Sequence, residues 1–170
     1  MSRLRVVTAA LLVTAALALQ VSVFPHLAWQ GVVPNLCLLV VVGAALARDG
    51  GFGMVLGFAA GLALDLAPPA DHVAGRWALA LVLVGYVAGR VRQDTEPTTP
   101  VVLATVAACS FVGTSVFALS GLLLGDLAVG IPELLRVVGA SVLWDLFLTP
   151  LVLPVALRLL SDSDAEAVPA

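Results

Sequence analysis

Long stretches without a single charge run through this chain and restrict what it can fold into. The first, Val6–Val23, contains only four polar residues, Thr8, Thr14, Gln20 and Ser22. A helix of this length covers the hydrocarbon layer of a bilayer. Hydrophobic residues make up 61% of the 170 positions, charged residues make up 11%, and the mean hydropathy is +1.12. These values indicate an integral membrane protein.

Turn signals between the apolar stretches predict an all-α fold with about six transmembrane helices. The expected helices cover residues 6–23, 34–47, 52–66, 77–89 and 101–124, followed by a last one that ends near residue 157. Pro150 and Pro154 should kink that last helix. The second and third helices are short for a layer of about 30 Å. Either flanking residues complete them, or they form a re-entrant hairpin.

The chain is predicted to form one transmembrane domain, residues 1–160, followed by a disordered acidic tail, residues 161–170. Short cytoplasmic loops collect Arg and Lys. With the N-terminus inside, six arginines are cytoplasmic, and only Arg76 and Arg136 lie outside. This bias predicts a multi-pass protein with both termini in the cytoplasm.

Small residues recur at intervals of four in two of the expected helices. Gly53, Gly57, Gly61 and Asp65 form one column on the third helix. In lipid, helices associate through small residues because these let backbones approach closely. The glycine column is therefore predicted to be a packing groove, either for a partner's helix or inside the monomer. A similar ladder follows the first helix, at Ala10, Thr14, Ala18 and Ser22.

Two acids are expected within or at the edge of the apolar layer, where an ionised carboxylate is costly unless it is paired or hydrated. Asp65 lies near the outer end of its helix, and we expect it to pair with Arg76 at the outer interface. Asp145 lies deeper in the layer. The hydroxyl donors expected for it are Thr14, Ser110, Thr114 and Ser115. The two acids could serve as polar anchors between helices or as a proton relay.

Patterns typical of catalysis are missing from the sequence. No GxSxG motif occurs, and no Ser or Cys is accompanied by a His within an apolar stretch. His26 and His72 lack the spacing of metal ligands. The sequence therefore predicts no catalytic, cofactor or metal site and no binding of nucleic acid.

Several segments together resemble the MreD family, the membrane subunit of the bacterial rod-shape-determining system. The resemblance extends from about Pro34 to Leu160. The segments that carry it are Pro34-Asn35-Leu36, GFAAGLALDL at residues 57–66, Gly75-Arg76, and Trp144-Asp145 with Pro150. The all-Arg, Ala/Val/Leu-rich usage resembles that of a high-GC bacterium such as an actinobacterium.

The resemblance implies a non-enzymatic scaffold in the bacterial cytoplasmic membrane that supports peptidoglycan synthesis and cell shape. Its expected partner is the bitopic protein MreC, within a larger complex that includes a SEDS glycosyltransferase, a class B penicillin-binding protein and MreB. The family is similar in fold to the substrate-binding subunits of energy-coupling-factor transporters. A membrane subunit that binds a vitamin or another small molecule is therefore the alternative.

Overall fold

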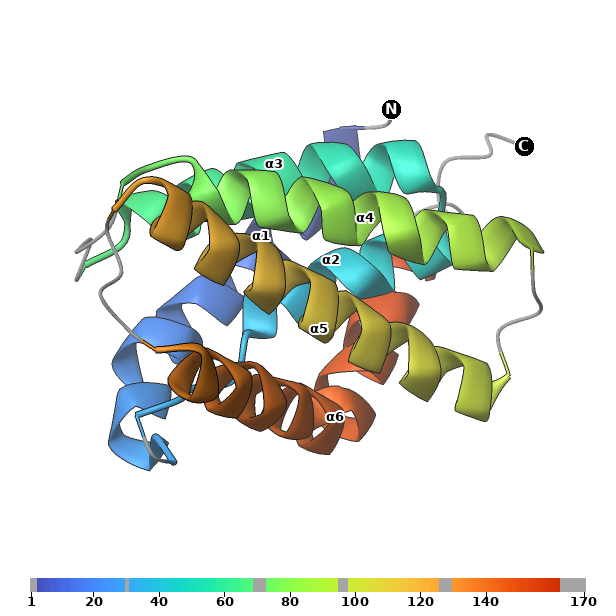
Figure 1. The fold of residues 1–170 in the computed structure, drawn as a ribbon. Coiled ribbons are helices and arrows are strands. Elements are labelled where there is room, and N and C mark those ends of the chain that lie inside the picture. Colours follow the sequence, from blue (N-terminus) through green and yellow to red (C-terminus); the bar gives the residue numbers. More distant parts are fainter. Residues whose placement is uncertain (1–2, 30, 69–72, 95–97, 126–129, 163–170) are drawn as a thin grey trace, which may run out of the picture.

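The computed structural model describes residues 3–29, 31–68, 73–94, 98–125 and 130–162. In these ranges the chain forms six α-helices and one short 3-10 helix (Figure 1). They are α1 (Arg3–Ser22), η1 (Phe24–Leu27), α2 (Leu36–Ala47), α3 (Gly50–Leu66), α4 (Arg76–Asp94), α5 (Thr99–Leu123) and α6 (Ile131–Asp162). The predicted all-α membrane-type fold is confirmed. Of the predicted tail, α6 includes residues 161 and 162, and residues 163–170 lie outside the described residues.

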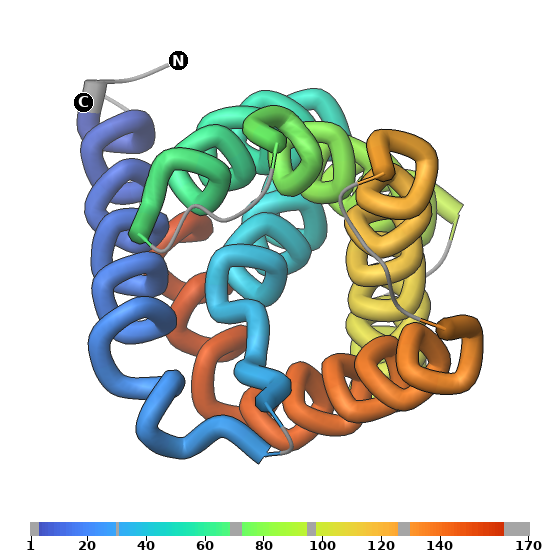
Figure 2. Tube along the Cα trace, turned by 60° about the vertical axis from the view of Figure 1, so that its left-hand side comes forward, coloured from blue at the N-terminus to red at the C-terminus, as the bar shows by residue number. Residues whose placement is uncertain are grey.

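Helix α2 lies at the centre of the molecule, with the other helices around it (Figure 2). Every residue from Leu36 to Leu46 is buried. A helix that is apolar on all sides needs neighbours on all sides, and α2 has them. Three helices, α1, α5 and α6, are long and apolar enough to cross a membrane, whereas α2 and α3 are shorter apolar helices. The short α2 is thus a core element of the bundle.

Two helix ends differ from the sequence prediction where an apolar stretch borders polar or glycine residues. Helix α4 continues beyond Gly89 to Asp94, because an apolar pattern marks where burial ends and not where a helix ends. Helix α3 begins at Gly50, since the Asp49 side chain accepts a hydrogen bond of 2.8 Å from the Phe52 N–H and caps the first turn.

Helix α6 is one continuous helix that contains both expected prolines. It changes direction between its orange first part and its red last part (Figure 2). A proline inside a helix removes one backbone hydrogen bond and crowds the preceding turn, so a bend near Pro150 and Pro154 is expected. The bend lets α6 pack against both α2 and α5.

Candidate functional site: buried anchors and an open groove

The glycine column of α3 packs against α4 of the same chain. A Cβ atom added to Gly57 would lie 2.3 Å from the carbonyl oxygen of Leu81. A Cβ atom on Gly85 of α4 would lie 2.4 Å from the carbonyl carbon of Gly53. These distances are far shorter than a van der Waals contact, so the two backbones meet at positions that have no room for a side chain.

Two further close approaches extend this contact toward both ends of the helix pair. A Cβ on Gly61 would lie 2.4 Å from the Cα of Ala78, and one on Gly89 would lie 2.2 Å from the Cα of Gly50. On α4 the two glycines follow the spacing Gly85-x-x-x-Gly89, which is a recognisable sequence signal for close helix packing. Since α4 covers this face of α3, the glycine column is not available to a partner's helix in this structure.

Asp65, at the end of the glycine column, accepts hydrogen bonds from the first turn of α4. Its Oδ2 accepts from the N–H groups of Gly75 at 2.8 Å and Ala78 at 3.1 Å, and its Oδ1 accepts from the N–H of Trp77 at 3.1 Å. The residue is 2% exposed. The first N–H groups of a helix have no partner within that helix. Asp65 therefore caps α4 from a neighbouring helix, where the helix dipole also favours a negative charge.

Arg76 is buried beside this cap and contacts α5. Its Nη2 donates a hydrogen bond of 2.8 Å to the carbonyl of Phe117, and its guanidinium carbon lies 4.0 Å from the centre of the Phe117 ring. The expected direct pairing of Asp65 with Arg76 stays a prediction. Asp65 links α3 to α4 and Arg76 links α4 to α5, both at the same end of the bundle.

Asp145 joins three helices from the middle of α6. Its Oδ1 accepts a hydrogen bond of 2.8 Å from the Asn35 N–H, just before α2, and its Oδ2 accepts one of 2.6 Å from the Ser110 hydroxyl of α5. Asp145 is fully buried. Of the four hydroxyls expected near it, Ser110 is the donor. Thr114 lies one turn further along α5 and lines a cavity together with Asn35.

Two amide side chains, those of Asn35 and Gln20, complete the capping of α2, a role that was not predicted for either residue. The Asn35 Oδ1 accepts from the Leu38 N–H at 2.9 Å, and the Gln20 Oε1 accepts from the Cys37 N–H at 3.3 Å. Asparagine directly before an apolar helix is a recognisable N-cap signal, whereas nothing in the sequence links Gln20 to α2. Because lipid supplies no hydrogen bonds, a helix end inside the membrane needs such partners.

The buried acids are held by backbone N–H and hydroxyl donors, an arrangement suited to anchoring helices. Among the described residues, no three His, Cys, Asp or Glu side chains gather as a metal site requires. Asp71, His72 and Asp126 lie outside the described residues.

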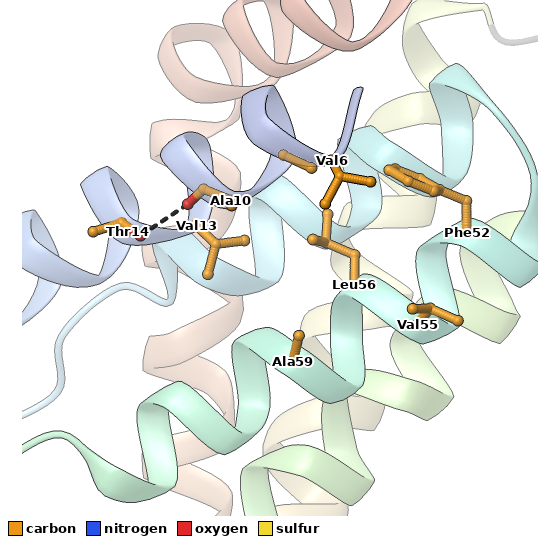
Figure 3. A pocket seen from close by; sticks show the side chains of 9 residues that line it. Val6, Ala10, Val13, Thr14, Phe52, Val55, Leu56 and Ala59 are labelled. Carbon is orange, nitrogen blue, oxygen red and sulfur yellow. Dashed lines mark hydrogen bonds between the residues drawn. The ribbon is translucent and has the colours of Figure 1, made fainter. Parts of the chain in front are cut away.

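An apolar groove of about 280 Å³ lies between α1 and α3 (Figure 3). On α3 it is lined by residues turned away from the glycine column, including Val55 and Ala59, and on α1 it includes Ala10 and Thr14 of the small-residue ladder. The Thr14 hydroxyl donates to the Ala10 carbonyl at 2.8 Å. The groove wall therefore combines small side chains with a hydroxyl that is already satisfied, which suits an apolar neighbour.

The fold and these features define an all-α membrane-type protein in which buried polar side chains hold helix ends together. The family model of the rod shape-determining protein MreD matches residues 1–159. The chain therefore belongs to the MreD family, a family of shape determination and not a known enzyme family. No curated protein and no solved structure matches the chain. The expected likeness to energy-coupling-factor subunits accordingly stays a prediction.

Proposed function

We propose that this protein is a non-enzymatic scaffold of the bacterial cell-elongation complex and that it binds the transmembrane helix of MreC in the groove between α1 and α3. Membership in a shape-determining family supports the general role. The groove is the observation that carries the proposal, because it is an apolar surface with small side chains on both walls that stays open after the internal helix contacts are made.

Helix α1 is the least covered of the three long apolar helices. Only 22% of its most apolar window is buried, against 39% for α5 and for α6. The small side chains Ala10 and Ala59 are exposed on the two walls of the groove. A third helix can place a ridge of side chains between two such walls. Close approach then provides dispersion energy that a disordered acyl chain provides less well.

The arrangement of the helix ends supports both termini on the cytoplasmic side. Arg48, in the α2–α3 turn, donates a hydrogen bond of 2.5 Å to the Leu160 carbonyl in the last turn of α6. Arg5 of α1 lines one surface hollow together with Arg48 and Asp49. The start of α1, the α2–α3 turn and the end of α6 thus share one end of the bundle, and its arginines fit the cytoplasmic side.

Filling the groove tests the MreC proposal. The variants Ala10→Leu and Ala59→Leu add bulk to the two walls, and we expect the double variant to lose most of the MreC that co-purifies in mild detergent. The matched control is Ala108→Leu, which makes the same change at an exposed position on α5. Co-purification that is unchanged in the double variant, with normal insertion, would contradict binding at this groove.

In this proposal the SEDS glycosyltransferase, the class B penicillin-binding protein and MreB join the complex through MreC or beside it. Isolating the protein from cells depleted of MreC distinguishes partners that bind through MreC from partners that bind the bundle directly. Partners that remain bound without MreC must contact another surface of the bundle.

A further inference from the structure

A cavity of about 430 Å³ with polar and charged residues in its lining lies at the end of the bundle where α1 and α5 end and α4 and α6 begin. Its lining comes from α1, the segment before α2, α4, α5 and α6. The volume falls in the range of small-molecule sites, roughly 300–1,000 Å³. This cavity is separate from the apolar groove between α1 and α3.

Two buried hydroxyls in the cavity differ from the other buried hydroxyls of the described chain. Thr105, Ser110 and Thr149 each donate a hydrogen bond, to the Val101 carbonyl, the Asp145 carboxylate and the Asp145 carbonyl. Thr114 and Ser141 are only 7% and 8% exposed, line the cavity, and bond to no described residue. Neither hydroxyl oxygen is completely covered by protein atoms, so both are accessible from the cavity. Two unbonded hydroxyls around one cavity indicate a site for a polar ligand.

The amide oxygens of the residues that line the cavity are hydrogen-bonded within the protein. The carbonyl oxygens of Asn35 and Gln20 already accept from backbone N–H groups of α2. The Asn35 Nδ2 is buried and has no hydrogen-bond partner among the described residues. This nitrogen has almost no accessible surface, so the donors that the floor offers to a ligand are the two hydroxyls. A ligand group with several oxygen acceptors fits such a floor.

The rim of the cavity carries one positive and one negative charge. Arg136 pairs with Glu133 one turn away on α6, with a distance of 3.0 Å between Nε and Oε2. Their side chains are 40% and 46% exposed, so the rim is accessible from outside the bundle. The rim therefore offers one cationic and one anionic side chain to a ligand that carries both charges.

We propose that this cavity binds a phosphoethanolamine group, with its phosphate oxygens facing the floor donors and its ammonium facing Glu133. Ser141 and Glu133 are eight residues apart, about 12 Å along α6. A ligand that reaches both positions needs its acceptor oxygens and its cation at opposite ends, as in the phosphate and the ammonium of phosphoethanolamine. The group can come from a phosphatidylethanolamine lipid or from a free solute.

Thermal unfolding of the delipidated full chain in detergent tests this site. The probes are dihexanoyl-phosphatidylethanolamine, O-phosphoethanolamine and, as an anion without an amine, dihexanoyl-phosphatidylglycerol. We expect the phosphatidylethanolamine to raise Tm by roughly 5 °C at a hundredfold excess over its Kd. A similar rise with O-phosphoethanolamine means that the free group suffices, and no rise with it means that the lipid is required. No rise with either, or an equal rise with the phosphatidylglycerol, overturns the proposal.

Matched variants distinguish ligand binding from a structural role. The double variant Thr114→Val with Ser141→Ala removes hydroxyls that bond to no described residue, so Tm without a probe should stay the same or rise slightly. The probe-induced rise should fall to less than half. Ser115→Ala, a change on the same helix at a half-buried hydroxyl outside the cavity, should keep the full rise. If the double variant does not fold, Ser141→Ala alone is measured, and a full rise in either variant overturns the proposal.

Discussion

The two faces of helix α3 carry small residues for opposite reasons. On one face, Gly57 touches the backbone of α4, and an added Cβ would lie 2.3 Å from the Leu81 carbonyl oxygen. On the other face, Ala59 is exposed and lines an open groove beside α1. Spacing alone does not distinguish the two faces, since both offer small side chains in lipid. The difference is whether the chain itself already covers the position, and adding bulk should therefore have opposite consequences.

The largest effect is expected on the covered face. Gly57→Ala should lower the stability by about 3 kcal/mol, at the upper end of overpacking costs, because the neighbouring atom is backbone and has to move with its helix. Thermal unfolding in detergent measures the change. Gly139→Ala is the matched control, since a Cβ there meets nothing within 4 Å and alanine favours a helix. Equal stability of the two variants would contradict a closed α3–α4 contact.

A somewhat smaller effect is expected where the glycine column ends. Asp65→Ala removes the acceptor of three N–H groups at the start of α4, and we expect a loss of about 2–3 kcal/mol. Asp65→Asn keeps one acceptor oxygen and should lose less. Asp49→Ala serves for comparison, because it removes a local cap with one hydrogen bond in an exposed setting, at a cost of about 1 kcal/mol. A larger loss for Asp49→Ala than for Asp65→Ala would show that the buried cap is unimportant.

The smallest effect on stability is expected on the open face. Ala59→Leu should change the stability by less than about 0.5 kcal/mol, as is usual for exposed positions. The same unfolding measurement, made on protein purified without MreC, checks it. A loss close to that of Gly57→Ala would mean that the groove is closed in the membrane, and the contrast between the two faces of α3 would disappear.

The sequence predicts which acids are buried in the bundle, but it does not predict which groups donate hydrogen bonds to them. The cost of a carboxylate in lipid singles out Asp65 and Asp145 in the sequence. The main acceptor role of Asp65 involves backbone N–H groups, which every residue except proline carries and no sequence pattern reveals. For Asp145, four hydroxyls were candidates, and only the packing of α5 against α6 brings Ser110 within 2.6 Å. Gln20 was not predicted at all, since its role depends on where α1 meets α2.

By itself, the sequence determined that this protein is an all-α membrane protein, because uncharged helices of this length are stable in lipid and unpaired backbone is not. It also determined where small residues allow close packing. Only the tertiary structure decided which small residues are already in contact, which helix becomes the buried centre, and which hydroxyls remain unbonded around a cavity. The physical reason is that propensity and hydropathy are local properties, whereas contact and hydrogen bonding depend on which distant segments the fold brings together.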